Sequence, residues 1–380
     1  MKYRQFGSLK WEPSALGFGC MRFPVVDGNK SRIDEEKASR MLLHAIDQGV
    51  NYIDTAYPYH GGTSEGFVGR TLEGSYREKV KLATKLPSWK IKSEADYDFY
   101  LNEQLERLRT ERIDFYLLHA LNTEYWDNLE KLGVLPWAEK ARADGRIGHL
   151  GFSFHDEYPV FESIIDAYQN WDFCLIQYNF MDQDYQAGRK GLKYAAERGM
   201  GVIIMEPLRG GRLVDPPQRV QELWERAENK RSPADWALQW LWNQPEVSLV
   251  LSGMSSLEQV KENIASASRS GTGNLSQSEL ALIDEVRNTY LGMELIPCTS
   301  CGYCVPCPEG VDIPRILRIH NDGIMYEKKD IARMEYTLWV PDQNKGNLCV
   351  VCRECEGNCP QDIPISDWMS SIHQEYTDAA

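Results

Sequence analysis

The sequence predicts an α/β fold, a (β/α)₈ barrel of the TIM type, followed by a small, mainly helical domain rich in cysteine. Two observations predict the barrel: eight short apolar runs between residues 15 and 265, and helix-period segments that separate them. A third sets the second domain apart, because eight of the ten cysteines lie after residue 297. A doubly wound sheet more often has about five or six strands, so eight strand–helix units favour the barrel.

The apolar runs are short and nearly continuous, as expected for parallel strands that helices cover on the outside. The segments between them carry apolar residues at helical spacing. The expected strands are residues 15–19, 51–56, 80–85, 113–119, 147–153, 173–179, 201–207 and 247–253. The clearest expected helices are residues 35–48, 93–109, 158–168, 186–198, 233–243 and 276–290.

Composition excludes several classes of partner. A formal net charge of −14, with no long Lys/Arg block to offset it, would repel a phosphate backbone, so nucleic acid is not an expected partner. The N-terminus lacks the apolar segment of a signal peptide, and no window is apolar enough to insert into a membrane. We therefore expect a cytoplasmic protein. Thiols stay reduced there, so clustered cysteines are expected to hold metal rather than form disulfides.

Polar residues stand at the ends of three neighbouring expected strands: Asp54, with Tyr57 and Tyr59 just beyond it, then Lys85, then His119. Alone, each has an ordinary explanation, such as a solvated lysine or a histidine satisfied in the core. In a barrel the carboxyl ends of the strands meet at one face, where the chemistry of this fold is found. The four side-chain types can therefore converge on one proton.

A tyrosine in such a group needs a pKa lowered from about 10 to act as an acid near neutral pH. The ammonium group of Lys85 would favour the phenolate of Tyr59, and Asp54 would keep that ammonium charged and oriented. His119 could donate a hydrogen bond to a substrate oxygen and fix its position. The pattern thus predicts an acid–base site.

The segment DTAYPYHGGTSEGFVGRTL, residues 54–72, resembles the signature D-T-A-x-x-Y-G-x-x-x-S-E-x-x-x-G-x-x-L of the aldo-keto reductases, with His60 in place of the usual glycine. The resemblance covers about residues 3–290 and includes LATK at Lys85 and LLH at His119. Asp54, Tyr59, Lys85 and His119 match the catalytic tetrad of the family in order and spacing.

The resemblance implies that the protein reduces the carbonyl group of a small aldehyde or ketone. NAD(P)H would deliver the hydride, and Tyr59 would protonate the carbonyl oxygen. Lys85 and Asp54 would tune Tyr59, and His119 would orient the carbonyl. Tyr57 is a rival phenol, but the family spacing favours Tyr59.

Cofactor contacts follow from the same resemblance. Ser153 and Gln177 match residues that bind the nicotinamide carboxamide, whereas Phe154 stands where many members have asparagine, a contact that His155 could replace. The segment MEPLRGGRL resembles the loop that crosses the pyrophosphate of the cofactor. For Met205, packing in the core is the alternative role. The residues that the resemblance places near the cofactor are Met205, Pro207, Leu208 and Gly211.

The segment SGMSSLEQVKEN resembles the part that binds the adenosine end of the cofactor. Two positions that carry lysine and arginine in some members are Gly253 and Gln259 here, so a preference for NADP over NAD does not follow. Lys261 or Arg269 could replace the missing cation. The expected contacts are Gly253, Gln259, Glu262 and Asn263.

The tail holds two cysteine runs, each followed by proline, and the second is C-x₂-C-x₂-C-x₃-C-P. The first run has two residues, not three, before its last cysteine. The pattern resembles a two-cluster bacterial ferredoxin, in which the last cysteine of each run completes the other cluster. This implies one [4Fe–4S] cluster on Cys298, Cys301, Cys304 and Cys359, and another on Cys307, Cys349, Cys352 and Cys355.

A pair of Cys₄ zinc sites is the alternative for these cysteines. Residues 313–339, between the runs, have a helical pattern, so we expect a helical dicluster domain at 293–380 after a barrel at 1–292. The clusters could be structural, could exchange electrons with a redox protein partner, or could dock onto a larger complex. Carbonyl reduction is the leading hypothesis; the other is an electron-transfer protein whose barrel is mainly a scaffold.

Overall fold

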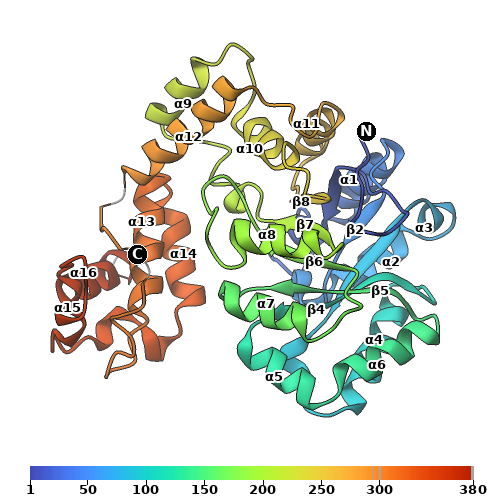
Figure 1. The fold of residues 1–380 in the computed structure, drawn as a ribbon, viewed down its shortest axis with the longest axis horizontal. Helices are drawn as coiled ribbons and strands as arrows, with labels where there is room; N and C mark the ends of the chain where they lie inside the picture. The colour runs from blue at the N-terminus through green and yellow to red at the C-terminus, as the bar shows by residue number, and fades with distance from the viewer. Residues whose placement is uncertain (294, 299–300, 378–380) are drawn as a thin grey trace. The chain divides into compact units, whose positions relative to one another are not determined.

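The structure, a computed structural model, describes residues 1–293, 295–298 and 301–377. Eight parallel strands close into a barrel in the order of the chain, each paired with the next and the last with the first (Figure 1). The expected eight-stranded α/β barrel is confirmed. The strands are β1 Leu16–Gly19, β2 Tyr52–Asp54, β3 Lys81–Leu86, β4 Ile113–Leu121, β5 Ile147–Phe154, β6 Phe173–Gln177, β7 Gly201–Met205 and β8 Leu249–Gly253.

Aromatic side chains fill the interior of the barrel. Phe6, which precedes the first strand, is fully buried, and its ring lies 5.4 Å from that of Phe115 and 6.0 Å from that of Phe173. Trp11 packs against the same cluster, with its ring 5.2 Å from Phe115. The interior is therefore a packed core, and chemistry is left to the residues at the strand ends.

Helices surround the barrel (Figure 1). In α1, Asp34 caps the N-terminus by accepting a hydrogen bond from the Lys37 amide at 3.2 Å, and Ala38, Leu42 and Ala45 form part of the buried stripe. The helices are α1 Glu35–Asp47, α2 Ser64–Thr71, α3 Ser75–Lys79, α4 Ala95–Arg107, α5 Thr123–Lys131, α6 Val134–Ala143, α7 Tyr158–Asp166, α8 Gly188–Glu197, α10 Pro233–Trp242 and α11 Leu257–Ser268.

The chain divides into two compact units, and the division is not a single cut. The first unit is residues 1–210 with 234–280, and the second is 211–233 with 281–380. Ion pairs join residues 211–233 to the rest of the second unit. Arg212 contacts Glu335, and Lys328 Nζ lies 2.5 Å from Asp215 Oδ2. The single boundary at 292/293 stays a prediction.

The second unit is a helical domain with its own hydrophobic core. Ile316, Tyr336 and Ile372 are fully buried in it, and they come from three different helices. The segment 313–339 is helical as expected, but it forms two helices that are separated around Glu327, whose φ is 52°. The helices are α9 Gln218–Glu225, α13 Ile313–Met325, α14 Lys329–Trp339, α15 Glu354–Gly357 and α16 Ile365–Thr377, together with most of α12 Gln277–Leu291, which begins in the first unit.

Short 3₁₀ helices connect several of these elements. None of the helices in the described parts of the chain combines the length and the apolar character that crossing a bilayer requires. The 3₁₀ helices are η1 Cys20–Arg22, η2 Tyr59–Gly62, η3 Ser88–Lys90, η4 Arg209–Gly211, η5 Asp342–Asn344 and η6 Gly346–Leu348.

Candidate active site and candidate iron–sulfur sites

A buried ion pair lies where β2 and β3 end. Lys85 Nζ donates to both carboxylate oxygens of Asp54, at 2.7 and 2.8 Å, and to the backbone oxygen of Thr55 at 2.8 Å. The side chains of Lys85 and Asp54 are only 1% and 4% exposed. A buried ammonium needs such partners, because its desolvation is unfavourable by several kcal/mol. The ion pair therefore fixes the position of Lys85.

Tyr59 and His119 complete the group. Lys85 Nζ also donates to Tyr59 Oη at 3.3 Å. The rings of Tyr59 and His119 are perpendicular, with centroids 6.3 Å apart. The structure thus brings together the four residues that the sequence placed on three neighbouring strands.

The pKa of Tyr59 is raised, so the expectation of a lowered pKa is wrong. Burial raises it, and the positive charge of Lys85 only partly offsets that effect. Burial also raises the pKa of Asp54, against the charge of Lys85, while Asp54 and Tyr59 outweigh burial and raise the pKa of Lys85. The pKa of His119 is well below 6.5, first because of burial and then because of Lys85. At neutral pH the phenol is therefore protonated, and the imidazole is neutral.

Two other residues of the signature segment have local roles. The Tyr57 ring lies 5.4 Å from that of Tyr100 and 4.5 Å from the guanidinium carbon of Arg107, so Tyr57 packs against α4. His60, in the position of the usual glycine, has a φ of 53°, a conformation that glycine adopts without strain. Its Nδ1 lies 2.9 Å from the Lys30 backbone oxygen, a contact that helps to hold this turn.

A bulge in β4 shapes the site around His119. The pairing of β4 with β5 shifts between Leu118 and Leu121, and Ala120 has a φ of 56°. The Ala120 amide donates to Ser153 Oγ at 2.7 Å, which leaves the hydroxyl hydrogen of Ser153 free to donate to another group. Bulges are frequent beside active sites, and this one contains His119.

Gln177, at the end of β6, is held by a buried carboxylate that sequence reasoning missed. Gln177 Nε2, Asn179 Nδ2 and Arg209 Nε all donate to Asp182 Oδ2, at 3.1, 3.2 and 3.0 Å. Since its amide nitrogen is used in this way, Gln177 keeps its oxygen as an acceptor, which suits the NH₂ group of a carboxamide. The only feature of the sequence that could have indicated this role of Asp182 is its position just beyond the end of a strand.

One aromatic ring packs against His119, and the charge of a second histidine acts on it. The rings of Trp89 and His119 have centroids 5.2 Å apart, and the charge of His155 contributes to the lowered pKa of His119. Gln186 Nε2 lies 3.5 Å from His155 Nδ1, and Gln186 has a φ of 55°. Among the described residues, Gln186 Oε1 and His119 Nδ1 are buried and have no hydrogen-bond partner.

The expected pyrophosphate loop begins at the end of β7. Met205 pairs with Gln177 across the sheet and packs partly against the barrel core, while Pro207 is buried and Leu208 is half-buried. Gly211 belongs to the second unit. The cofactor contacts of these four residues stay predictions.

The expected adenosine-binding segment has contacts of its own. The Ser255 amide donates to Gln259 Oε1 at 2.8 Å, so Gln259 braces the turn before α11, and Asn263 Nδ2 donates to Ser252 Oγ at 3.0 Å. A Cβ on Gly253 would lie 3.1 Å from carbons of Arg22, so a larger residue there would displace Arg22. Glu262 is exposed.

The two candidate replacement cations at this end differ. Arg269 Nη2 donates to the buried carboxylate of Asp235 at 3.0 Å, so its charge is already compensated. Lys261 is exposed. Of these two cations, Lys261 is therefore the better candidate partner for a 2′-phosphate.

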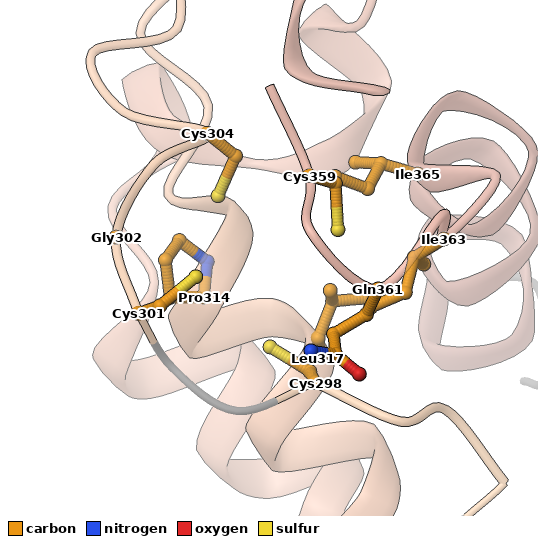
Figure 2. A pocket seen from close by; sticks show the side chains of 10 residues that line it. All are labelled: Cys298, Cys301, Gly302, Cys304, Pro314, Leu317, Cys359, Gln361, Ile363 and Ile365. Carbon is orange, nitrogen blue, oxygen red and sulfur yellow. The ribbon is translucent and has the colours of Figure 1, made fainter. Parts of the chain in front are cut away.

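In the second unit, four cysteines line one pocket. Figure 2 shows the sulfur atoms of Cys298, Cys301, Cys304 and Cys359 turned towards a common space. Burial raises the pKa of Cys304, and the other three thiols raise it further. Apolar residues form much of the rest of the lining, and the non-cysteine residues there are Gly302, Pro314, Leu317, Gln361, Ile363 and Ile365.

A second group contains three cysteines from the two runs, Cys307, Cys349 and Cys355. Burial raises the pKa of Cys355 to about 11, and Glu356, Cys349 and Cys307 raise it further. Cys307, from the first run, therefore lies near Cys349 and Cys355 of the second. Cys352 is exposed. The two groups follow the crossed pattern that the ferredoxin resemblance implied.

The spacing of the cysteines bears on which metal they fit. A tetrahedral zinc site, with Zn–S bonds of about 2.3 Å, would bring its sulfurs within about 4 Å of one another. Among the described residues, no three His, Cys, Asp or Glu side chains are grouped closely enough to hold a single metal ion. Cys₄ sets also hold multi-iron clusters, of which the run C-x₂-C-x₂-C-x₃-C-P is typical.

Hydrogen bonds hold the segments that precede each cysteine run. Asn321 Nδ2 donates to the Ile296 backbone oxygen at 2.7 Å and accepts from the Ile296 amide at 3.1 Å, just before Cys298. The Gly346 amide donates to Tyr336 Oη at 3.0 Å, just before Cys349. The helices thus fix the start of both runs.

Comparison with known proteins identifies both parts of the chain. The aldo/keto reductase family model matches residues 15–288, and the model of a 4Fe-4S dicluster domain matches residues 297–364. An uncharacterized oxidoreductase of Bacillus subtilis, YqkF, is 28% identical over 70% of this chain and 91% of its own length. The NADH-specific methylglyoxal reductase of Escherichia coli is 25% identical over 75% of this chain and 98% of its own.

A solved structure is similar as well. The aldo-keto reductase AKR11C1 from Bacillus halodurans, in its holo form, has a TM-score of 0.62 and 27% identity, and it covers 75% of this chain and 96% of its own. The chain belongs to the aldo/keto reductase family. More particularly, it is an oxidoreductase of that family with a C-terminal 4Fe-4S dicluster domain, and these two parts imply a nicotinamide cofactor and iron–sulfur clusters.

Proposed function

We propose that the protein uses NADH or NADPH to reduce the carbonyl group of a small aldehyde or ketone to an alcohol. The observation that carries the proposal is the hydrogen bond from the Lys85 ammonium to Tyr59 Oη, with Asp54 holding Lys85 in place. Because an ammonium group can only donate, the hydrogen of the Tyr59 hydroxyl must point elsewhere. Tyr59 is therefore arranged to donate its proton.

The raised pKa of Tyr59 supports this direction of reaction. A phenol that stays protonated at neutral pH has a proton to give to the oxygen of a carbonyl that is being reduced. His119, neutral at the same pH, donates its N–H to that oxygen and so orients the carbonyl. The bound nicotinamide supplies the hydride to the carbonyl carbon.

The nicotinamide is proposed to bind at the ends of β5 and β6. The Ser153 hydroxyl and the Gln177 amide oxygen offer one donor and one acceptor to its carboxamide. A relative named as an NADH-specific methylglyoxal reductase supports a nicotinamide cofactor and a small carbonyl substrate. Parallel assays with NADH and NADPH decide between the two cofactors.

We propose that the two cysteine groups hold two [4Fe–4S] clusters, which supply one-electron chemistry when bound. The pocket lined by four thiols and the crossed grouping support this assignment. The exposure of Cys301 and Cys352 favours a second candidate function, electron exchange with a redox protein, because each group has one cysteine at the surface. The ligands would be Cys298, Cys301, Cys304 and Cys359 for one cluster and Cys307, Cys349, Cys352 and Cys355 for the other.

A Tyr59→Phe variant tests the proposed function, because it keeps the ring and removes only the hydroxyl group with its acidic proton. NAD(P)H-dependent reduction of aldehydes should fall by about 10²- to 10⁴-fold, the usual contribution of a positioned acid. Tyr57→Phe is the matched control and should change the rate only a few-fold, because Tyr57 packs against α4. Equal rates in both variants, or binding of cofactor without turnover of any aldehyde, would favour the electron-transfer function.

A further inference from the structure

A buried carboxylate lies behind the ion pair of the barrel site, and the proposed chemistry does not use it. Glu65 stands in the first turn of α2 and is fully buried, as are its neighbours Thr84 of β3 and Gln104 of α4. Thr84 Oγ1 donates to Glu65 Oε1 at 2.7 Å, and Gln104 Nε2 donates to the same oxygen at 2.6 Å. Arg107 Nη1 donates to the other oxygen at 3.3 Å. Three elements, α2, β3 and α4, therefore meet at this carboxylate.

Gln104 connects the carboxylate to the backbone of Lys85. Its Nε2 atom also donates to the Lys85 backbone oxygen at 3.0 Å, so the two hydrogens of the amide nitrogen serve Glu65 and Lys85. Its Oε1 atom accepts from the hydroxyl of Tyr116 at 2.7 Å. A backbone oxygen can only accept, so an amide turned the other way would place two oxygens face to face. The orientation of Gln104 is therefore fixed.

This support acts at a point where the sheet holds Lys85 on one side. The pairing of β3 with β2 runs from Lys81 to Ala83, and it ends two residues before Lys85. On the other side, Lys85 pairs with Leu117 of β4. Gln104 therefore holds the end of β3 beyond its pairing with β2.

The start of α2 also supports the other acceptor of the Lys85 ammonium. Lys85 Nζ donates to the backbone oxygen of Thr55 at 2.8 Å, and the hydroxyls of Thr55 and Ser64 form a hydrogen bond of 2.9 Å. Both residues are fully buried, and Ser64 precedes Glu65 in the chain. Ser64 and Glu65 thus connect α2 to both strand ends that carry the ion pair.

Packing alone does not require a carboxylate at this position. Removing a charge from water is unfavourable, and well-packed apolar residues often stabilise a protein as well as a buried ion pair does. Burial raises the pKa of Glu65, and its hydrogen bonds offset that effect only in part. An apolar core, however, offers no directional bond to the backbone oxygen of Lys85, whereas Gln104 does.

We propose that Gln104 and Glu65 are positioning residues of the barrel site, which fix the end of β3 and thereby set the distance between the Lys85 ammonium and Tyr59 Oη. That distance is 3.3 Å. The proposal rests on the proposed function, because the placement of Lys85 affects the rate only if Tyr59 acts as the acid. Gln104 and Glu65 act through Lys85 rather than on the substrate.

Gln104→Met in the full-length, cluster-loaded protein tests the proposal, with benzaldehyde and benzyl alcohol as probes. Methionine keeps the length of the side chain but donates to neither Glu65 nor Lys85. The kcat of benzaldehyde reduction should fall about 10- to 100-fold, because a misplacement of about 1 Å can lower a rate by about 10²-fold. The affinity for NAD(P)H, measured by fluorescence, should not change. A crystal structure of the variant should show Lys85 Nζ farther from Tyr59 Oη.

The pH profile of the reverse reaction separates positioning from a loss of stability. The charges that act on Tyr59 are those of Lys85, Asp54 and Cys20, and of these three the charge of Lys85 lowers its pKa. If Lys85 moves away, the pKa of Tyr59 rises further. The pH at which the oxidation of benzyl alcohol accelerates should therefore shift upwards in Gln104→Met.

Gln239→Met is the matched control. Gln239 is a buried glutamine of α10 whose Nε2 atom likewise joins a carboxylate, that of Asp235 at 3.0 Å, to a backbone oxygen, that of Ser266 at 2.9 Å. This variant should unfold at a lower denaturant concentration, as Gln104→Met does, but keep the kcat and the pH profile of the wild type. Glu65→Gln keeps an acceptor oxygen for Gln104 and should retain most of the wild-type kcat.

Each outcome has a distinct meaning. An unchanged kcat in Gln104→Met overturns the proposal, and so does an equal fall in Gln239→Met, which would assign both effects to lost stability. If Gln104→Met does not fold, Tyr116→Phe decides, because it removes only the hydroxyl that donates to Gln104 Oε1. It should lower kcat a few-fold, and an unchanged kcat overturns the proposal. If the wild-type protein binds NAD(P)H but reduces neither benzaldehyde nor any other aldehyde, the proposed function itself fails, and the positioning role fails with it.

Discussion

The barrel site and the cysteine sites differ in one respect: whether the protein itself supplies the partners of their polar groups. In the barrel, the chain itself supplies every partner described for the Lys85 ammonium: the Asp54 carboxylate, the Thr55 carbonyl and the Tyr59 hydroxyl. In the second unit, thiols face thiols, and after burial the neighbouring thiols contribute to the raised pKa of Cys304 and of Cys355. The barrel site is complete once the chain has folded, whereas the cysteine sites require a cation to offset the repulsion between thiolates.

This contrast shows two ways to place reactive groups inside a protein. A buried ion pair organises the barrel site before any ligand binds, and the arrangement is stable because each charge has a partner of opposite sign. Thiolate sites couple folding to metal binding, because the ligands are deprotonated when the metal binds. A variant that disrupts one of these sites should therefore leave the other intact.

The largest effect is expected from Cys359→Ala. This variant removes one of the four thiols around the pocket of Figure 2, so one cluster should be lost and the iron content should fall from about eight to about four per chain. The second unit should also unfold at lower denaturant concentration, because metal binding contributes to its folding. Iron analysis and denaturant titration of anaerobically purified protein measure both effects.

Cys174→Ala is the control for this experiment, because Cys174 is a fully buried cysteine in β6 and belongs to neither group. Its iron content should stay near eight. A Cys359→Ala protein that keeps about eight irons would show that Cys359 is not a ligand.

The second prediction breaks the barrel site. Lys85→Met should lower the kcat of carbonyl reduction by about 10²- to 10⁴-fold, because the Tyr59 hydroxyl loses the group that orients it. It should also destabilise the fold by about 3–5 kcal/mol, since the Asp54 carboxylate remains buried without its partner. The iron content should not change. Steady-state kinetics and denaturant titration test these effects.

Two further variants sharpen this prediction. Lys81→Met is the control at the other end of β3, where Lys81 is 44% exposed and pairs with Asp114 at 3.1 Å; a change of at most about 1 kcal/mol is expected there. The double variant Asp54→Leu/Lys85→Met should recover stability but not activity, because it leaves no buried charge unpaired. Recovery of both would mean that the ion pair is only structural.

The smallest effect is expected from pH. The pKa of Tyr59 is raised above 10 and that of His119 is lowered well below 6.5, so neither group changes protonation between about pH 7 and 9. The kcat of carbonyl reduction should be flat over that range and fall at higher pH, as Tyr59 loses its proton. Oxidation of the alcohol needs the phenolate and should instead rise with pH.

Tyr57→Phe should leave the shape of both pH profiles unchanged. A rate of reduction that already declines between pH 7 and 8 would indicate a Tyr59 pKa lowered by Lys85. In that case the charge of Lys85, rather than burial, would dominate the environment of the phenol.

Much of the barrel could be predicted from the sequence, because its strands are nearly continuous apolar runs and parallel strands end at one face. Asp54, Lys85 and His119 could be brought together on that ground alone. The direction of the pKa shift of Tyr59 could not be predicted, because two effects oppose each other. Burial raises the pKa and the charge of Lys85 lowers it, and the extent of burial depends on packing. Asp182 was missed for a related reason, since its contacts with Gln177 and Arg209 depend on how the loops after β6 and β7 fold.

The second unit shows a different limit. The spacing of the cysteines and their resemblance to ferredoxins led to the crossed grouping that the structure shows around Cys304 and Cys355. The sequence did not predict that residues 211–233 belong to the second unit. Their place depends on ion pairs between residues far apart in the sequence, such as Arg212 and Glu335. A local sequence pattern predicts single helices and strands better than it predicts which distant segments pack together.

The crossed grouping of the cysteines has a consequence for the order in which the protein is made. Cys298, Cys301 and Cys304 leave the ribosome early, but the pocket that they line is closed by Cys359, close to the end of the chain. Cys307 likewise waits for Cys349 and Cys355. Neither site can be completed on a nascent chain that stops between the two runs, so metal loading of either site has to wait for the second run, and a product truncated between the runs would carry neither finished centre.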